Sequence, residues 1–161
     1  MSLSQRIVDA VRLFESPGRL PGQVEIDLDE GGRIALALAE VGPVGLAFDR
    51  LEYQSGEGVD RSAESLRGWA DRLAARTTYL MEPLVVVEHD LEAGAIDVRS
   101  KAPTVRNGRR AYYEVRLGRQ GTLALSRVVF DEATRSREAV ACPMTFETLD
   151  RLIEDIRDTS R

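Results

Sequence analysis

The dipeptide Asn107-Gly108 constrains this fold more than any other short feature, because it fixes how two strands pair. It lies in the segment TVRNGRRAYYEVRL, between two runs in which apolar and polar residues alternate. Asn and Gly both tolerate the positive φ angles of a type I′ turn, a common two-residue connection of β-hairpins. The sequence therefore predicts a hairpin in which Arg106 lies opposite Arg109.

Counting outward from this turn gives a register for the whole hairpin. The predicted pairs are Ala102 with Tyr113, Lys101 with Glu114, Ser100 with Val115, Arg99 with Arg116 and Val98 with Leu117. The Lys101–Glu114 pair is favourable, whereas two arginines directly opposite one another repel. Pro103 lacks an N–H, so we expect it at an edge or at a position without a ladder hydrogen bond.

The next turn, in the segment GRQG, extends the register to a third strand. A three-residue loop over 119–121, with Gly121 in the left-handed region, pairs Leu117 with Leu123 and Val115 with Leu125. One face of the sheet is then apolar and belongs to the core. The opposite face presents Arg110, Tyr112 and Arg116 beside Ala124, Val128 and Phe130.

The other periodic patterns predict three helices and additional strands. Apolar spacing indicates helices after Ser2, over 62–76 and after Thr145, the first ended by the segment SPG. Alternation predicts strands near 24–28, 34–38, 44–53 with a bulge at 49–50, 95–101, 109–117, 122–131 and 137–142. The run LVVV at 84–87 is apolar on both faces and predicts a central strand. We therefore expect a single α+β domain over residues 1–161, with a largely antiparallel sheet and N-terminal, middle and C-terminal helices.

Composition narrows the classes of partner. The formal net charge of −5 and the pI near 5.1 argue against general affinity for DNA or a membrane surface, because phosphate would be repelled. No apolar run approaches the length needed to span a bilayer, and charged residues interrupt the N-terminal segment, so we expect a cytoplasmic protein. One lysine beside 21 arginines indicates GC-rich, bacterial coding, which weakens each arginine as evidence of function.

Few residues suggest chemistry. His89, the only histidine, lies between Glu88 and Asp90, but those carboxylates would point to the opposite face of a strand, so no dyad is predicted. Cys142, the only cysteine, excludes an intramolecular disulfide and is expected to be a buried thiol. The sequence predicts no catalytic residue, no cofactor and no metal site.

Two further features have competing interpretations. The acidic residues at 27, 29 and 30 surround a turn and are read as a solvated hairpin tip rather than a cation site. Trp69 falls in an apolar helical stripe and is expected to pack in the core. In an alternative architecture, a curved sheet grips the C-terminal helix around a ligand pocket, with Trp69 and Tyr53 as lining.

The mixed face gives the candidate site. Aromatic groups rimmed by arginine are enriched in partner-binding surfaces, so we expect Arg110, Tyr112, Arg116 and Phe130 to bind a protein partner or a second copy of the chain. In a competing interpretation, the protein's own helices cover this face and its own carboxylates neutralise the arginines. A nucleic-acid partner is disfavoured. The alternative function is a small-ligand protein or enzyme with a pocket near His89 and the meander.

The order helix, three strands, helix, strands, helix on a small acidic chain resembles that of the type III secretion chaperones. That resemblance rests on element order, size and acidity and on no residue motif. It implies a non-catalytic, chaperone-like protein that forms a homodimer and wraps an extended partner segment. It assigns no binding residue in this sequence.

Overall fold

A computed structural model describes residues 1–56, 58, 60–90 and 94–161 of the chain, with residues 88–90 described by their backbone only. The helices are α1 (Leu3–Arg12), a short 3-10 turn η1 (Leu13–Glu15), α2 (Ala63–Arg76) and α3 (Phe146–Thr159). The strands are β1 (Gly22–Asp27), β2 (Arg33–Val41), β3 (Gly45–Gln54), β4 (Leu84–Asp90), β5 (Ala95–Ser100), β6 (Thr104–Arg106), β7 (Arg109–Gly118), β8 (Thr122–Asp131), β9 (Ser136–Val140) and β10 (Cys142–Thr145). This arrangement confirms the predicted α+β class.

Each α-helix begins directly after a side chain that caps it, next to its predicted start. The side chains of Ser2, Ser62 and Thr145 accept hydrogen bonds from backbone N–H groups three residues later, at 3.1 Å in each case. Such caps satisfy donors that the first helical turn leaves unpaired. Helix starts are therefore local properties of this chain, and all three were predicted correctly.

The strands form one sheet in the order β1-β2-β3-β8-β7-β5-β4, and every pairing that the structure describes is antiparallel. β3 pairs with β8 over Leu51–Gln54, and then the two strands diverge. The continuous segment formed by β9 and β10 fills the gap, with β9 pairing to β8 and β10 to β3. The predicted bulge in β3 is confirmed, since Asp49 has no partner between Phe48 and Arg50.

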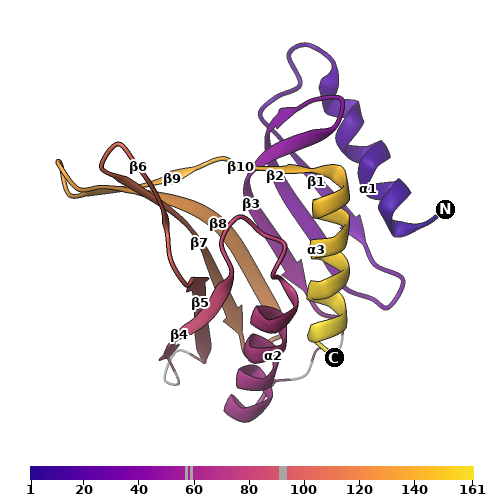
Figure 1. The fold of residues 1–161 in the computed structure, drawn as a ribbon. Coiled ribbons are helices and arrows are strands. Elements are labelled where there is room, and N and C mark those ends of the chain that lie inside the picture. Colours follow the sequence, from indigo (N-terminus) through magenta and orange to yellow (C-terminus); the bar gives the residue numbers. More distant parts are fainter. Residues whose placement is uncertain (57, 59, 91–93) are drawn as a thin grey trace.

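One face of the sheet carries the core. α1, α2 and α3 all lie on the same side of the sheet, and the β6–β7 and β8–β9 hairpins extend away from them (Figure 1). Apolar stripes of the helices and alternate residues of the strands join in a single cluster that includes Val11, Leu36, Trp69, Val115 and Ile153. We call the opposite side, which no helix covers within the described residues, the helix-free face. The sheet thus has one face packed against the helices and one face without helices among the described residues.

The prediction of a central strand at 84–87 was wrong. Among the strands that the structure describes, β4 pairs only with β5 and forms an edge of the sheet. Val85 and Val87 point to the helix-free face and are 37 % and 43 % exposed, while Leu84 and Val86 pack toward the core. An apolar run signals burial on both faces only if helices cover both, and here they cover one.

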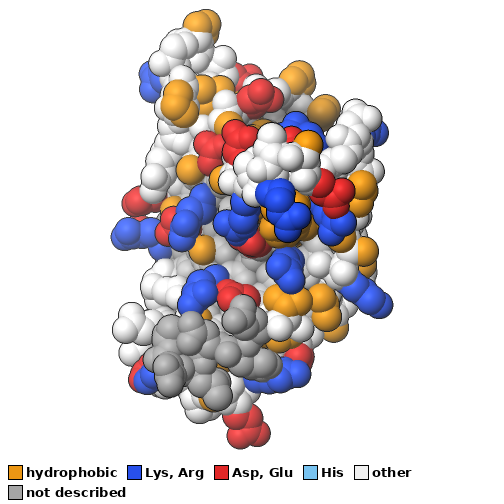
Figure 2. All heavy atoms as spheres, turned by 90° about the vertical axis from the view of Figure 1, so that its left-hand side faces the viewer, with side chains coloured by type: hydrophobic (Ala, Val, Ile, Leu, Met, Phe, Trp, Pro, Cys, Tyr) orange, Lys and Arg blue, Asp and Glu red, His pale blue; other side chains and the backbone are white. Residues whose placement is uncertain are grey.

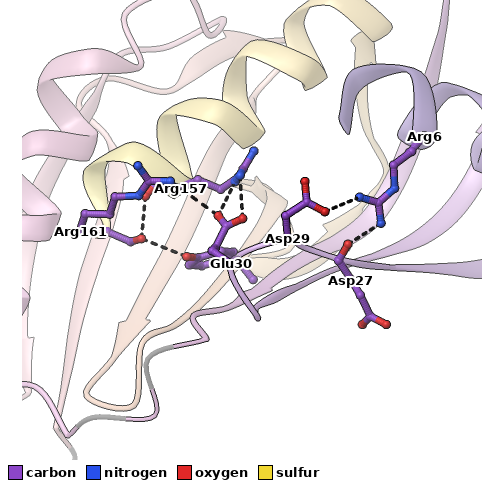
Figure 3. Close-up of polar contacts among 8 residues, drawn as sticks. Arg6, Asp27, Asp29, Glu30, Arg157 and Arg161 are labelled. Atoms are coloured by element: carbon purple, nitrogen blue, oxygen red, sulfur yellow. Dashed lines mark hydrogen bonds and ion pairs between the residues drawn. The ribbon is translucent and has the colours of Figure 1, made fainter. Parts of the chain in front are cut away.

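The acidic turn between β1 and β2 anchors two helices instead of facing solvent alone. Glu30 accepts a bidentate pair of hydrogen bonds from Arg157 of α3, at 2.7 and 2.8 Å (Figure 3). Arg6 of α1 bonds the carbonyl of Asp27 and pairs with Asp29 at 3.5 Å. The pairing with Arg157 lowers the pKa of Glu30. These contacts fix the hairpin against the helical layer.

No helix in the described parts of the chain is long and apolar enough to cross a membrane.

Candidate functional site: the helix-free face of the sheet

The structure brings the four predicted binding residues together. β7 and β8 pair in the predicted register, with Leu117 opposite Leu123 and Arg110 opposite Phe130, and Gly121 adopts a φ of 77° in the connecting turn. Arg110, Tyr112 and Arg116 alternate along β7, so all three project from the helix-free face beside Phe130. The two arginines are exposed, and the two aromatic residues are half-buried. The predicted surface therefore exists as one patch.

The interpretation that helices cover this face is wrong, but its electrostatic part is correct. Arg116 pairs with Asp97 at 3.2 Å, and Arg50 pairs with Glu52 at 2.8 Å. Arg110 pairs with Glu132, and Arg137 pairs with Glu114. Exposed pairs of this kind contribute at most about 1 kcal/mol each, so a partner's charges can compete with them.

Figure 2 shows the distribution of charged side chains on the side of the molecule that lies at the left in Figure 1. Lys and Arg side chains gather across the middle of that side, with Asp and Glu between them (Figure 2). Hydrogen bonds to Glu114 and then to Tyr112 raise the pKa of Arg137.

Two adjoining hollows open on this face. The larger, of about 460 Å³, is lined by Arg50, Val87, Asp97, Val98, Arg99, Glu114, Val115, Arg116, Ala124, Ser126 and Arg137. The smaller, of about 290 Å³, is lined by Arg99, Ser100, Lys101, Pro103, Arg110, Tyr112 and Phe130. Arg99 borders both, and the hollows follow one another along β7, the larger at 114–116 and the smaller at 110–112, so together they form a groove that runs along this strand. We call the combined surface the arginine groove.

The register at the groove differs from the prediction near Pro103. The Asn107-Gly108 turn pairs Arg106 with Arg109 as predicted, and Asn107 and Gly108 have φ angles of 54° and 73°. However, residues 101–103 separate β6 from β5 and shift the pairing by two residues. Pro103 cannot donate to the ladder, and the Ser100 hydroxyl accepts a hydrogen bond from the Tyr113 N–H at 2.8 Å instead.

This shift decides which charges meet. The predicted pairs Lys101–Glu114 and Arg99–Arg116 are absent, because Glu114 lies opposite Arg99 and Arg116 lies opposite Asp97. The shift of two residues keeps each side chain on its predicted face, since strand side chains alternate with a period of two. The prediction of which β7 residues project from the helix-free face was therefore correct, even though the predicted cross-strand pairs with β5 were not.

Sequence reasoning missed a buried ion pair on the opposite face. Arg127 of β8 donates two hydrogen bonds to Glu82, at 2.9 and 3.0 Å, and these residues are 5 % and 3 % exposed. Ser100 and Thr104 donate to the same carboxylate at 3.0 and 2.6 Å. Arg127 also lies over the Tyr113 ring, 4.5 Å from its centroid. Each carboxylate oxygen of Glu82 thus accepts two hydrogen bonds.

The energetics of this pair favour a structural role. Burial opposes ionisation of Glu82, yet the hydrogen bonds from Arg127, Thr104 and Ser100 outweigh burial and lower its pKa. The only available signal was the position of Arg127, which alternates with core-facing Leu123 and Leu125 along β8. Glu82 lies between α2 and β4, where no periodic pattern applies, so no local signal could identify it.

Burial accounts for the cysteine and tryptophan. Cys142 is buried, and desolvation raises the pKa of its thiol to about 12. Trp69 is fully buried and packs edge-on against Tyr53, with ring centroids 6.2 Å apart. Both aromatic residues belong to the hydrophobic core. These placements match the core interpretation of both residues.

The remaining candidates yield little. The backbone of His89 pairs with Ile96 in β4, whereas its side chain lies outside the described residues. Within the described parts of the chain, no three His, Cys, Asp or Glu side chains are grouped so that they could hold a metal ion.

No family model matches the chain, and comparisons with curated proteins and with solved structures find no significant match.

Proposed function

We propose that this chain is a non-catalytic binding module whose helix-free sheet face binds a polypeptide partner. The observation that carries the proposal is the arginine groove, where Arg110, Tyr112, Arg116 and Phe130 form part of an open surface beside two hollows. Half-buried aromatic side chains next to guanidinium groups are what binding hot spots enrich. A chaperone-like role on a bacterial partner is part of this proposal.

The groove suits a macromolecular partner better than a small ligand. Six of the eleven residues that line its larger hollow are charged. Pockets for small molecules are mostly apolar with a few placed polar groups, because burial of apolar ligand surface supplies most of the affinity. A wide charged surface with a few aromatic anchors is typical of a polypeptide interface.

Site-specific photocrosslinking tests the proposal. A photoreactive phenylalanine analogue replaces Tyr112, which is half-buried in the groove, and separately replaces Leu13, which is 68 % exposed next to α1. In an extract of the source cells we expect a discrete adduct from position 112, lost when Arg116→Glu is added, and none from position 13. The adduct mass separates another polypeptide from a second copy of this chain.

Equal adduct patterns from positions 112 and 13, or no adduct at position 112, would overturn the proposal. An adduct at position 112 that survives Arg116→Glu would remove Arg116 from the site. Thermal melts of each labelled protein check that the substitutions leave the fold intact.

A further inference from the structure

We infer that the polypeptide bound by the arginine groove is an acidic segment in extended conformation; this inference rests on the proposed function. The residues that line the two hollows include six basic ones, Arg50, Arg99, Lys101, Arg110, Arg116 and Arg137, and two acidic ones, Asp97 and Glu114. That is a formal surplus of four positive charges on a chain of net charge −5. Complementary charge selects partners and accelerates encounter.

Two of the basic groups are available without breaking an ion pair. Arg99 and Lys101 are both exposed, and neither forms an ion pair with another of the described residues. Glu114 lies opposite Arg99 in the ladder, but its carboxylate pairs with Arg137. The strands thus leave cationic groups at the junction of the two hollows.

Arg99 is also positioned for a carboxylate. Its guanidinium lies over the Tyr112 ring, 5.8 Å from the centroid. Stacking uses the face of a guanidinium and leaves its N–H edge free to bind a carboxylate through two hydrogen bonds. Tyr112, Phe130 and Pro103 provide apolar surface beside it. The groove therefore matches acidic residues that alternate with apolar ones.

The spacing of the groove fits an extended chain. Arg110, Tyr112, Glu114 and Arg116 project at every second position of β7, which places neighbours about 6.6–6.8 Å apart. Alternate side chains of an extended peptide have the same spacing, so such a peptide along β7 meets successive groups in step. A nucleic acid fits less well, because Asp97, Glu114 and Glu132 interrupt the basic groups. Every nucleotide carries a phosphate, whereas a peptide can place neutral residues opposite these three carboxylates.

Fluorescence anisotropy with three labelled ten-residue peptides tests the inference. One peptide has Glu at every second position with Tyr and Ser between, and the others carry Gln or Lys in place of Glu. At low salt we expect the Glu peptide to bind at least tenfold more tightly than the Gln peptide, with no binding of the Lys peptide. Higher salt should weaken binding, because mobile ions screen exposed charges.

Two matched variants locate the effect. Arg99→Gln with Lys101→Gln removes two positive charges from the groove, while Arg19→Gln with Arg67→Gln removes two exposed charges elsewhere. We expect at least a tenfold loss of affinity for the Glu peptide in the groove variant and less than a twofold change in the control. Melting temperatures verify that both variants fold.

Several results would overturn the inference. These are equal binding of the Glu and Gln peptides, equal losses in the two variants, or tighter binding of a ten-nucleotide single strand that displaces the Glu peptide. If the chain self-associates in solution and the Glu peptide does not change the mass of that assembly, the result would also count against the inference. If the crosslink at position 112 persists while the peptides show no charge preference, the inference fails and the proposed function stands. If neither the crosslink nor peptide binding is seen, both fail.

Discussion

The buried pair of Glu82 and Arg127 gives the sharpest test of how this fold is held together. Arg127→Met keeps most of the side-chain volume but leaves the Glu82 carboxylate buried without a cation, retaining only the Ser100 and Thr104 hydroxyl bonds. Removing one partner of a buried pair costs about 3–5 kcal/mol, since an uncompensated charge remains. For a chain of 161 residues, an unfolding entropy of about 2.1 cal/mol/K per residue converts that loss into a fall in Tm of roughly 9–15 °C.

A double-mutant cycle in urea measures the coupling. Glu82→Gln keeps an acceptor oxygen for one of the two hydroxyls, and the oxygen of the other hydroxyl can accept a hydrogen bond from the new amide NH2. The double variant Glu82→Gln with Arg127→Met therefore contains no buried charge. We expect it to lose clearly less than the sum of the single losses, with a coupling of about 2 kcal/mol or more. The same cycle on the exposed pair Arg50–Glu52, whose side chains are 57 % and 56 % exposed, should give under about 1 kcal/mol.

Additive losses at the buried pair, within about 0.5 kcal/mol, would refute this reasoning, because independent sites add. A loss below about 1 kcal/mol for Arg127→Met would also refute it, since such a value is typical of exposed ion pairs.

Three further predictions concern pH, thiol reactivity and the turns. The pKa of Glu82 is lowered in the folded protein. The ionised side chain therefore stabilises the fold fully above its unfolded pKa of about 4.3, and this stabilisation is lost as the pH falls through the folded pKa. Melting temperatures measured from pH 7 to pH 3 should decline less steeply in Glu82→Gln than in the parent protein. Cys142, with a thiol pKa of about 12, should react with a thiol reagent at pH 8 about 10³-fold more slowly in the native protein than in urea; comparable rates would mean that Cys142 is accessible in the folded protein. Gly121→Ala should lower the free energy of unfolding in urea more than Gly108→Ala does. Both glycines have a positive φ (77° and 73°), which costs an alanine about 1–2 kcal/mol at either position, but at Gly121 the new Cβ would also lie 2.7 Å from the Cβ of Ser55. Equal losses would contradict the predicted clash with Ser55.

The sequence predicted what neighbouring residues decide. Helix caps at Ser2, Ser62 and Thr145, the left-handed turns at Asn107 and Gly121, and the alternation along β7 all depend on contacts within a few residues. These features fixed the three helix starts, two strand ladders and the membership of the helix-free face. The candidate binding residues followed from them, because a turn type and a period of two are enough to assign side chains to faces.

The tertiary structure decided everything that depends on which distant segments meet. Among the described elements, the helices cover one face of the sheet and β4 pairs only with β5, so β4 is an edge strand with two exposed valines despite its apolar run. Pro103 interrupts the ladder, which moves Glu114 opposite Arg99 and leaves Lys101 without an ion pair among the described residues. Glu82 finds Arg127 45 positions along the chain, where no local pattern signals the pairing. Such contacts reflect burial and charge compensation between segments that only the folded chain brings together, so the sequence could identify the candidate binding face but not the groove on it.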